Sequence, residues 1–211
     1  MKTIFWNVDT QYDFMRDKGA LAVSDAYIIE ENLQTLTEFA HTKGVQIIFT
    51  GDWHTPDSSE FSSVPDYKQT YPPHCLINTQ GAAFIPATTP YKPFIIDWQD
   101  KSLDTEALVR HKGDIVIYKD AFDVFAGSPH SETVLQIIQP SKVVVYGVAA
   151  NVCVHYAICG LLQRGKTVYA VLDAMKGLPE LPLEPLIKQW KSKGSLLVRT
   201  EDVLSVMDKL L

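Results

Sequence analysis

The sequence predicts an α/β protein, a three-layer α/β/α sandwich around a six-stranded parallel sheet. Short apolar, β-branched runs alternate along the chain with longer amphipathic segments, a pattern typical of strands joined by right-handed helical crossovers. The runs are so apolar that helices must cover both faces of the sheet. The 211 residues suffice for one large domain, and we expect a single domain over residues 1–211.

The first quarter of the chain predicts two strands and one helix. Residues 3–9, TIFWNVD, read as a strand. The segment from Ser24 to Gly44 repeats apolar residues at helical spacing, with the serine expected as N-cap and the glycine as its end. A second strand is expected at 45–52. The stretch 53–102 is rich in proline, serine, threonine and aromatic residues, and loops this long are usually functional or disordered.

The rest of the chain alternates between the two patterns. The expected strands lie at 114–119, 142–148, 167–173 and 195–200. The expected helices lie at 105–111, 129–139, 151–165, 183–194 and 201–211. Together with the first two strands, these elements make up the predicted six-stranded sheet and its covering helices.

Composition and charge exclude several functional classes. A formal net charge of -6 argues against a nucleic-acid surface, which needs clustered lysine and arginine. No apolar run approaches the roughly 18 residues of a membrane span, and the first strand meets an acid at Asp9, unlike a signal peptide. Three cysteines are too few for a disulfide framework. We therefore expect a cytoplasmic protein without nucleic-acid or membrane partners.

Chemically capable side chains stand where several predicted strands end. Asp9, Asp52, Lys119 and Asp173 close four of the strands, and Cys153 follows a fifth. In an open parallel sheet the ligand binds beyond the carboxyl ends of the strands. The sequence therefore predicts a site at this edge, where the long loop also begins.

The segment VVVYGVAANVCVHYAICGLLQRG places Cys153 at the start of a predicted helix. Unpaired N–H groups and the helix dipole there favour a thiolate, and the same N–H groups can hold an oxyanion. The alternative is a small buried residue that packs helix on sheet. Cys159 lies inside the same helix, where packing is the better interpretation.

A nucleophilic thiol needs a base and a group that orients the base. Asp9, flanked by apolar residues, is a candidate to accept the proton, and Lys119 is a candidate to balance that carboxylate. Taken singly, a strand-end aspartate often caps a turn and a lysine is usually solvated. The hypothesis depends on both lying beside Cys153.

A second cluster lies in the long loop. Asp52 and His54 are two residues apart in an extended segment, so both side chains leave the same face. His74 and Glu60 lie further along the loop. One aspartate and two histidines are a common ligand set for Zn²⁺, Mn²⁺ or Fe²⁺, and an added glutamate and water favour five or six ligands over a tetrahedron. Alternatively, both histidines are ordinary loop residues.

These residues carry a resemblance to a known family. NVDTQYDFM resembles the opening motif of nicotinamidases, and DWH, SSEF and YPPHC resemble their metal loop. GVAANVCV resembles the turn that carries the nucleophile in isochorismatase-like cysteine hydrolases. The matches run in the right order from residue 5 to about residue 173. The chain is thus similar to the nicotinamidase/pyrazinamidase branch of that superfamily.

The resemblance implies specific roles. It implies a catalytic triad and an oxyanion hole built from the amides on either side of the nucleophile turn. The triad would be Asp9, Lys119 and Cys153, and the oxyanion amides would be those of Ala149 and Cys153. It also implies a cis peptide at Val148–Ala149. The metal ligands would be Asp52, His54 and His74, with Glu60 where some members place a further ligand.

The activity implied is hydrolysis of nicotinamide to nicotinate and ammonia through a cysteine thioester, a step of NAD salvage. The cofactor implied is a divalent metal, Zn²⁺ before Mn²⁺ or Fe²⁺, and the partner a small heteroaromatic amide. Phe14 is the first candidate to stack on the substrate ring, with Tyr71 and Trp53 next. Tyr71 stands where many nicotinamidases have tryptophan, and Asn151-Val152 also departs from the common pattern.

Other functions remain open at this stage. One is a related amidase acting on a carbamoyl or ureido compound, which bound metal would argue against. Another is a non-catalytic binding protein that keeps the pocket. Isochorismatase itself, a vinyl ether hydrolase, does not use a cysteine. The sequence also leaves the oligomeric state open, and a homo-oligomer is one alternative.

Overall fold

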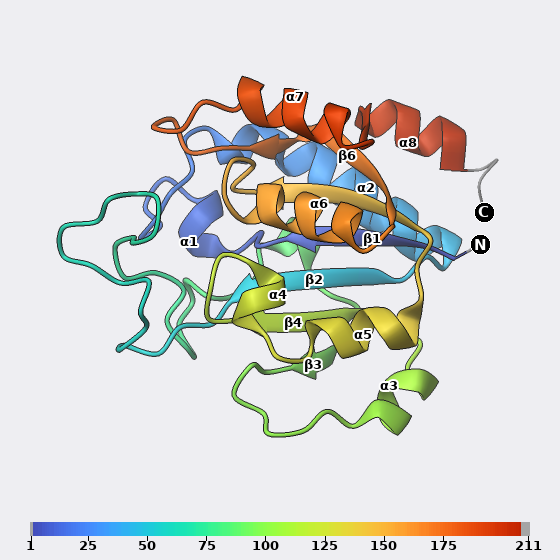
Figure 1. The fold of residues 1–211 in the computed structure, drawn as a ribbon, viewed down its shortest axis with the longest axis horizontal. Coiled ribbons are helices and arrows are strands. Elements are labelled where there is room, and N and C mark those ends of the chain that lie inside the picture. The colour runs from blue at the N-terminus through green and yellow to red at the C-terminus, as the bar shows by residue number, and fades with distance from the viewer. Residues whose placement is uncertain (1, 208–211) are drawn as a thin grey trace.

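The computed structural model describes residues 2–207 and builds them around one parallel sheet (Figure 1). The strand order is β3-β4-β2-β1-β5-β6-β7, and every pair is parallel. The strands are β1 (Thr3–Val8), β2 (Ile47–Asp52), β3 (Phe94–Ile96), β4 (Ile115–Lys119), β5 (Lys142–Val148), β6 (Thr167–Lys176) and β7 (Leu196–Val198). The expected α/β class and parallel sheet are confirmed.

The sheet has seven described strands, not six. The added strand, β3, is three residues long and pairs with β4 at the edge of the sheet. It lies inside the stretch 53–102 that was expected to be irregular. Three residues are too few to show an alternating pattern, so this edge strand could not be separated from the loop.

Helices cover both faces of the sheet, as expected (Figure 1). They are α1 (Tyr12–Met15), α2 (Glu30–Lys43), α3 (Thr105–Arg110), α4 (Val124–Gly127), α5 (Ser131–Ile138), α6 (Cys153–Gln163), α7 (Glu184–Ser192) and α8 (Thr200–Met207). Two 3₁₀ turns, η1 (Ala26–Ile29) and η2 (Pro86–Thr88), complete the set. The helices α4, α5 and α6 lie on one face, and α2 packs against α8 on the other. None of the helices within residues 2–207 has the length and apolar character that a membrane crossing needs.

Several expected boundaries are corrected. Ser24 does not cap a helix, because η1 comes first and its N-cap is Asp25 in the left-handed conformation. Gly44 does end α2, with φ 66°. The four-residue helices α1 and α4 were not expected, since one turn gives no helical period. The last helix was expected over 201–211, of which residues 208–211 lie outside the described part.

The central strands are the most buried part of the molecule. Every described residue of β1 and β2 is buried, and β5 is buried beyond its first residue. Burial on both faces explains why these runs are continuously apolar and do not alternate. The long loop after β2 leaves from the carboxyl edge of this core and projects to one side (Figure 1).

Candidate active site

The ends of four neighbouring strands place the predicted triad together. Asp9 follows β1, Asp52 ends β2, Lys119 ends β4 and Cys153 begins the helix after β5. These strands are adjacent in the order β4-β2-β1-β5, so their carboxyl ends meet at the middle of the sheet edge. The expected clustering of these four residues is therefore what the fold produces. Parallel pairing together with this strand order accounts for it.

Asp173 does not join them. It lies inside β6, which continues to Lys176, so the strand does not end where the sequence predicted. Its carboxylate accepts the backbone N–H of Thr200 at 2.8 Å and lies 3.6 Å from Arg199. Asp173 therefore holds the start of α8 and not the site.

Lys119 lies at the centre of the group. Its Nζ is 2.9 Å from Asp9 Oδ2 and 3.9 Å from Cys153 Sγ, and it also donates to Asp52 Oδ1. The other oxygen of Asp9 accepts the Thr50 hydroxyl at 2.6 Å. Lys119 and both carboxylates are at most 1% exposed, so the ammonium is held among groups that water does not screen.

The ionisation of the group follows from this packing. Burial alone would lower the pKa of Lys119, but Asp52 and Asp9 outweigh it and hold that pKa well above its usual range. Burial alone would raise the pKa of Asp52, but Lys119 and the imidazoles hold it well below its usual range. Burial raises the pKa of Asp9, and Lys119 only partly opposes this. Asp9 is therefore the more basic of the two carboxylates.

The thiol is buried too. Burial raises the pKa of Cys153 well above its usual range, Asp9 and Asp52 act in the same direction, and Lys119 opposes them. One oxygen each of Asp9 and Asp52 lies within 4.8 Å of the sulfur. The resting group is thus a protonated thiol with a carboxylate close enough to take its proton.

The turn from β5 to α6 presents the thiol at the pocket. Gly147 has φ 123°, and a Cβ at this position would lie 2.1 Å from the Val8 carbonyl oxygen, so the close approach of β5 to β1 requires glycine. The peptide Val148–Ala149 is cis, as the resemblance implied. In the described chain neither the Ala149 nor the Cys153 amide donates to another backbone group. Both N–H groups are therefore available for an oxyanion.

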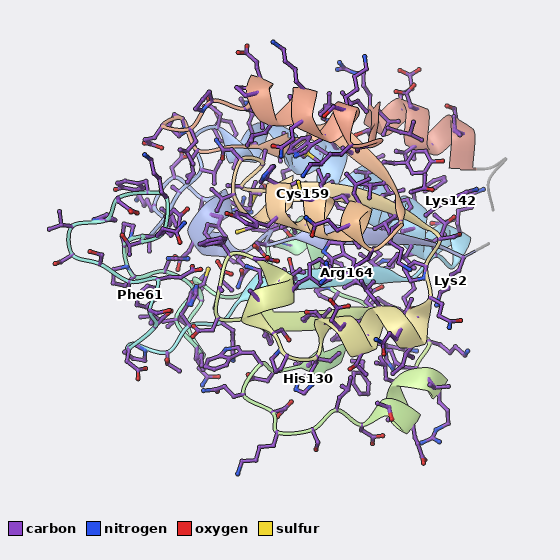
Figure 2. All side chains as sticks on the ribbon, in the orientation of Figure 1. Lys2, Phe61, His130, Lys142, Cys159 and Arg164 are labelled. Atoms are coloured by element: carbon purple, nitrogen blue, oxygen red, sulfur yellow. The ribbon has the colours of Figure 1, made fainter. Side chains whose placement is uncertain are left out.

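Asn151, which departs from the common motif, fixes this turn. Its side-chain amide donates to the carbonyls of Leu178 and Leu181 at 2.7 Å each and accepts the Leu178 N–H at 2.9 Å. Gly177 passes close to the same side chain. The asparagine thus ties the nucleophile turn to the segment after β6. Cys159, by contrast, lies within α6 away from this turn, as expected (Figure 2).

Three residues form a candidate metal site beside the triad. One ligand atom each from Asp52, His54 and His74 lies within 4.8 Å of the others. His74 Nε2 is 3.3 Å and His54 Nε2 3.7 Å from the same oxygen, Asp52 Oδ2. All three side chains are buried. Phe61, labelled in Figure 2, packs its ring 5.0 Å from that of His54.

The second nitrogen of each imidazole is already occupied. His54 Nδ1 lies 2.7 Å from Asp120 Oδ1 and 3.0 Å from the Ser58 hydroxyl, and His74 Nδ1 lies 2.8 Å from the Pro72 carbonyl. This leaves Nε2 of each ring toward the aspartate. His54 Nε2 is buried without a hydrogen-bond partner. One carboxylate and two such oriented imidazoles fit a divalent metal ion.

Glu60 lies at the edge of this group. Its Oε2 is 3.9 Å from His54 Nε2, and its Oε1 accepts the Phe122 N–H at 2.6 Å. Burial and the Asp52 charge raise the pKa of Glu60 to about 7. One oxygen is thus committed to the backbone, and only the other faces the histidine.

Members of both sets line one small pocket. Its polar and reactive lining consists of Asp52, Glu60, Tyr71, His74 and Cys153. Its apolar lining consists of Phe14, Leu21, Val23, Phe122, Ala149, Val152 and Leu178. Phe14 and Tyr71 thus lie where a substrate ring was expected to bind.

Trp53 does not line the pocket. Its ring stacks on Tyr118 at 4.2 Å, and its carbonyl accepts the Trp98 indole N–H at 2.8 Å. The reason is the alternation that also makes the metal site. Asp52 and His54 leave one face of the extended segment, so the residue between them faces the other side.

Sequence reasoning missed several residues that hold the site. Gln11 donates through Nε2 to the carbonyls of Asp52 and Ala82, at 2.7 and 2.8 Å, and accepts the Asp52 N–H at 2.8 Å. Asp13 accepts the backbone N–H of Cys75 at 2.7 Å. Both belong to the NVDTQYDFM motif. The motif therefore does more than supply Asp9, since it also anchors the metal loop.

Comparisons with known proteins agree with this geometry. A family model described as Isochorismatase domain matches residues 98–202. The nicotinamidase/pyrazinamidase of Mycobacterium tuberculosis is 29% identical over 181 residues, covering 81% of this chain and 84% of that protein. The nicotinamidase of Escherichia coli is 26% identical over 188 residues, covering 81% of each.

Solved structures extend the likeness to nearly the whole chain. The structure of pyrazinamidase of Pyrococcus horikoshii in complex with zinc has 27% identity and a TM-score of 0.73, covering 94% of this chain and 99% of that one. N-carbamoylsarcosine amidase from Thermoplasma acidophilum has a TM-score of 0.71 over 95% of this chain and 98% of that one. At 21% identity, the second likeness shows the fold alone.

Proposed function

We propose that the chain, which is similar to isochorismatase-like hydrolases over most of its length, is a cysteine amidohydrolase that converts nicotinamide to nicotinate and ammonia. The observation that carries the proposal is that Cys153, with Asp9 and Lys119 buried beside it, lines a pocket that also borders a candidate metal site. The named relatives that hydrolyse nicotinamide or pyrazinamide support the substrate class.

The charge of the pocket favours a neutral substrate. Its lining residues include the acids Asp52 and Glu60 and no lysine or arginine. The nearby ammonium of Lys119 is already paired with two carboxylates. No lining side chain would pair with a substrate carboxylate, which is costly to bury alone, so such a carboxylate would depend on the metal ion for a partner. The lining side chains therefore suit an uncharged aromatic amide better than a carbamoyl amino acid.

The chain's own residues account for acylation. Asp9 takes the proton of the Cys153 thiol, and the sulfur attacks the carboxamide carbon. The carbonyl oxygen becomes an oxyanion held by the Ala149 and Cys153 N–H groups, where one such donor is typically worth about 3 kcal/mol. Asp9 returns the proton to the amide nitrogen as the C–N bond breaks and ammonia leaves. A thioester remains.

Deacylation uses the same groups. Asp9 removes a proton from a water molecule, whose oxygen attacks the thioester carbon. The C–S bond breaks, the proton held by Asp9 returns to the Cys153 sulfur, and the acid product loses its own proton to solvent and leaves as nicotinate. Lys119, 2.9 Å from Asp9, keeps that carboxylate in place and balances its charge through both steps.

The metal site completes the substrate pocket. Asp52, His54 and His74 would hold the ion, with Glu60 as a further contact, and zinc is proposed from the ligand types and from the zinc-bound structural relative. When bound, the ion supplies a Lewis-acidic anchor for the ring nitrogen of the substrate.

Hydrolysis of nicotinamide by the purified protein tests the proposal. Ammonia release should be lost on chelation and restored by Zn²⁺ or Mn²⁺, with bound metal measured in parallel by elemental analysis. N-Carbamoylsarcosine serves as the competing substrate. Hydrolysis of that compound and not of nicotinamide would contradict the proposal, and so would a protein that binds nicotinamide and releases no ammonia.

A further inference from the structure

A second pocket lies at the amino ends of the strands, on the edge of the sheet opposite the proposed active site. Its described lining comes from the start of β1, the turn before β2 and the ends of α2, α3 and α5. Since β1 has six residues, Thr3 in this lining and Asp9 in the site are about 20 Å apart. Figure 2 shows the same separation, with Lys2 at one end of the molecule and Phe61, which packs on His54, at the other. The proposed reaction uses none of the residues of this pocket.

The lining of this pocket is positive, although the chain as a whole has a formal net charge of -6. Among the described residues the lining contains the lysines Lys2, Lys43 and Lys112 and no aspartate or glutamate. Asp114 follows Lys112 by two residues, but it is buried, lies 2.8 Å from His41 Nε2 and accepts two backbone N–H groups. That acid is thus satisfied within the fold and does not pair with Lys2 or Lys112.

Lys2 and Lys112 are held close to each other in this lining. The Lys2 ammonium donates to Gln46 Oε1 at 3.2 Å, and Gln46 Nε2 donates to the carbonyl of Gly113 at 2.9 Å. Gln46 therefore links Lys2 to the residue that follows Lys112. Burial lowers the pKa of Lys2, and the charge of Lys112 lowers it further. The two ammonium groups repel each other, and an anion bound between them would offset that repulsion.

The same lining holds a hydroxyl that has no hydrogen-bond partner in the described chain. Thr3 is 6% exposed, and its Oγ1 is buried and unpaired among the described residues. Its backbone is fixed, because Thr3 lies opposite Lys142 in the pairing of β1 with β5. Buried polar groups are nearly always hydrogen-bonded. An unpaired hydroxyl in the wall of a positive pocket is therefore a position where a ligand oxygen supplies the missing partner.

We propose that this pocket binds a phosphate group, free or as the monoester of a small molecule, through Lys2, Lys112 and Thr3. A phosphate monoester carries about 1.5 to 2 negative charges at neutral pH and three acceptor oxygens, which matches two ammonium groups and one hydroxyl. A carboxylate has one charge and two oxygens, so it suits this set less well. Val109 and Ile137, in the same lining, offer apolar surface to the organic part of an ester. The inference does not rest on the proposed amidase function.

Isothermal titration calorimetry with inorganic phosphate and with phenyl phosphate tests the site. Lys2→Met combined with Lys112→Met should weaken the binding of both at least about tenfold, because each substitution removes a charged donor. Lys188→Met combined with Lys191→Met is the matched control. It removes the same charge from the exposed face of α7 and should change either affinity by less than about twofold. Equal affinities would identify free phosphate as the ligand, and tighter binding of phenyl phosphate would identify an ester; both results support the site.

Thr3→Val separates binding from folding. Valine has nearly the shape of threonine and lacks the unpaired hydroxyl, so the free energy of unfolding without ligand should be unchanged or higher. Phosphate affinity should nevertheless fall about three- to tenfold, because the ligand loses one donor. A threonine with only a structural role would leave the affinity of the pocket unchanged, and that result would overturn the role given to its hydroxyl.

Three further results would overturn the proposal. The first is absence of binding by the unmodified protein. The second is binding that survives the Lys2→Met and Lys112→Met pair, which would place the anion elsewhere, for instance on a bound metal ion, or an equal loss in the control pair. The third is benzoate binding as tightly as phenyl phosphate, which would show a site for carboxylates. Ammonia release from nicotinamide, measured on the same preparations, tests the proposed function separately.

Discussion

Asp9 and Lys119 form an ion pair that is almost completely buried, with 2.9 Å between Oδ2 and Nζ. The same ammonium also bonds Asp52, so one cation is shared between the proposed catalytic base and a proposed metal ligand. The proposed catalytic group and the metal group are therefore one electrostatic unit. Removing the Lys119 ammonium leaves two buried carboxylates without the cation they share.

Lys119→Met should destabilise the fold strongly. Breaking a buried ion pair by removing one partner typically costs about 3 to 5 kcal/mol. We expect a loss of this size in the free energy of unfolding, measured by urea denaturation at neutral pH. Lys188→Met, on α7, is the control and should change the free energy by less than about 0.5 kcal/mol. A loss below about 1 kcal/mol for Lys119→Met would contradict the buried pair.

The loss in the free energy of unfolding caused by Lys119→Met should depend on pH. Lys119 partly opposes the rise that burial causes in the pKa of Asp9, so its removal raises that pKa further. A carboxyl whose folded pKa exceeds its unfolded pKa loses stability as pH rises. The penalty of Lys119→Met should thus be larger at about pH 8 than at about pH 5. The opposite trend would show that Asp9 is not the group left unpaired.

Asp120→Ala should weaken metal binding without touching a ligand. Its Oδ1 lies 2.7 Å from His54 Nδ1 and orients the ring toward Asp52. Loss of such a carboxylate typically costs 10- to 100-fold in metal affinity. Zinc titration against a competing chelator measures this directly. Asp57→Ala is the control, since Asp57 lies in the loop that carries His54, is exposed and accepts the Thr55 hydroxyl at 2.6 Å. Equal affinity of the two variants would exclude this role for Asp120.

Gln11→Met should destabilise the anchoring of the metal loop. The side-chain amide is fully buried and satisfies the Asp52 N–H and carbonyl and the Ala82 carbonyl. Methionine has a similar length and no hydrogen-bonding amide, so these backbone groups lose their partner, at a cost of about 1 to 3 kcal/mol. Chemical denaturation checks this. Gln34→Met, on the exposed face of α2, should be nearly neutral, and similar losses for both would argue against the anchoring role.

The site residues that could be predicted from the sequence are those that lie at the carboxyl ends of strands. Asp9, Asp52, Lys119 and Cys153 each follow or end a strongly apolar strand, and parallel pairing places all these ends on one edge of the sheet. The sequence did not give the strand order, which makes the four strands neighbours. Trp53 was misplaced because aromatic character was weighed without the alternation that had been applied to its two neighbours. Asp173 was misplaced because β6 runs three residues further than its apolar pattern.

The residues that hold the site through hydrogen bonds could not be recognised from a sequence pattern. Gln11 and Asp120 are single polar residues in turns, and their partners are 41 and 66 residues away along the chain. No local pattern distinguishes them from solvated residues. The edge strand β3 was missed for a related reason, because its three residues are recruited by pairing with β4 and not by a periodicity of their own.

The central claim is that Cys153 is the nucleophile of an amidase. Its most direct test is the rate of ammonia release from nicotinamide by Cys153→Ala, with Cys159→Ala as the control on the same helix. We expect Cys153→Ala to lose at least about a thousandfold in rate while its circular dichroism and melting transition stay unchanged, and Cys159→Ala to retain activity. Appreciable turnover by a folded Cys153→Ala would contradict covalent catalysis at this residue.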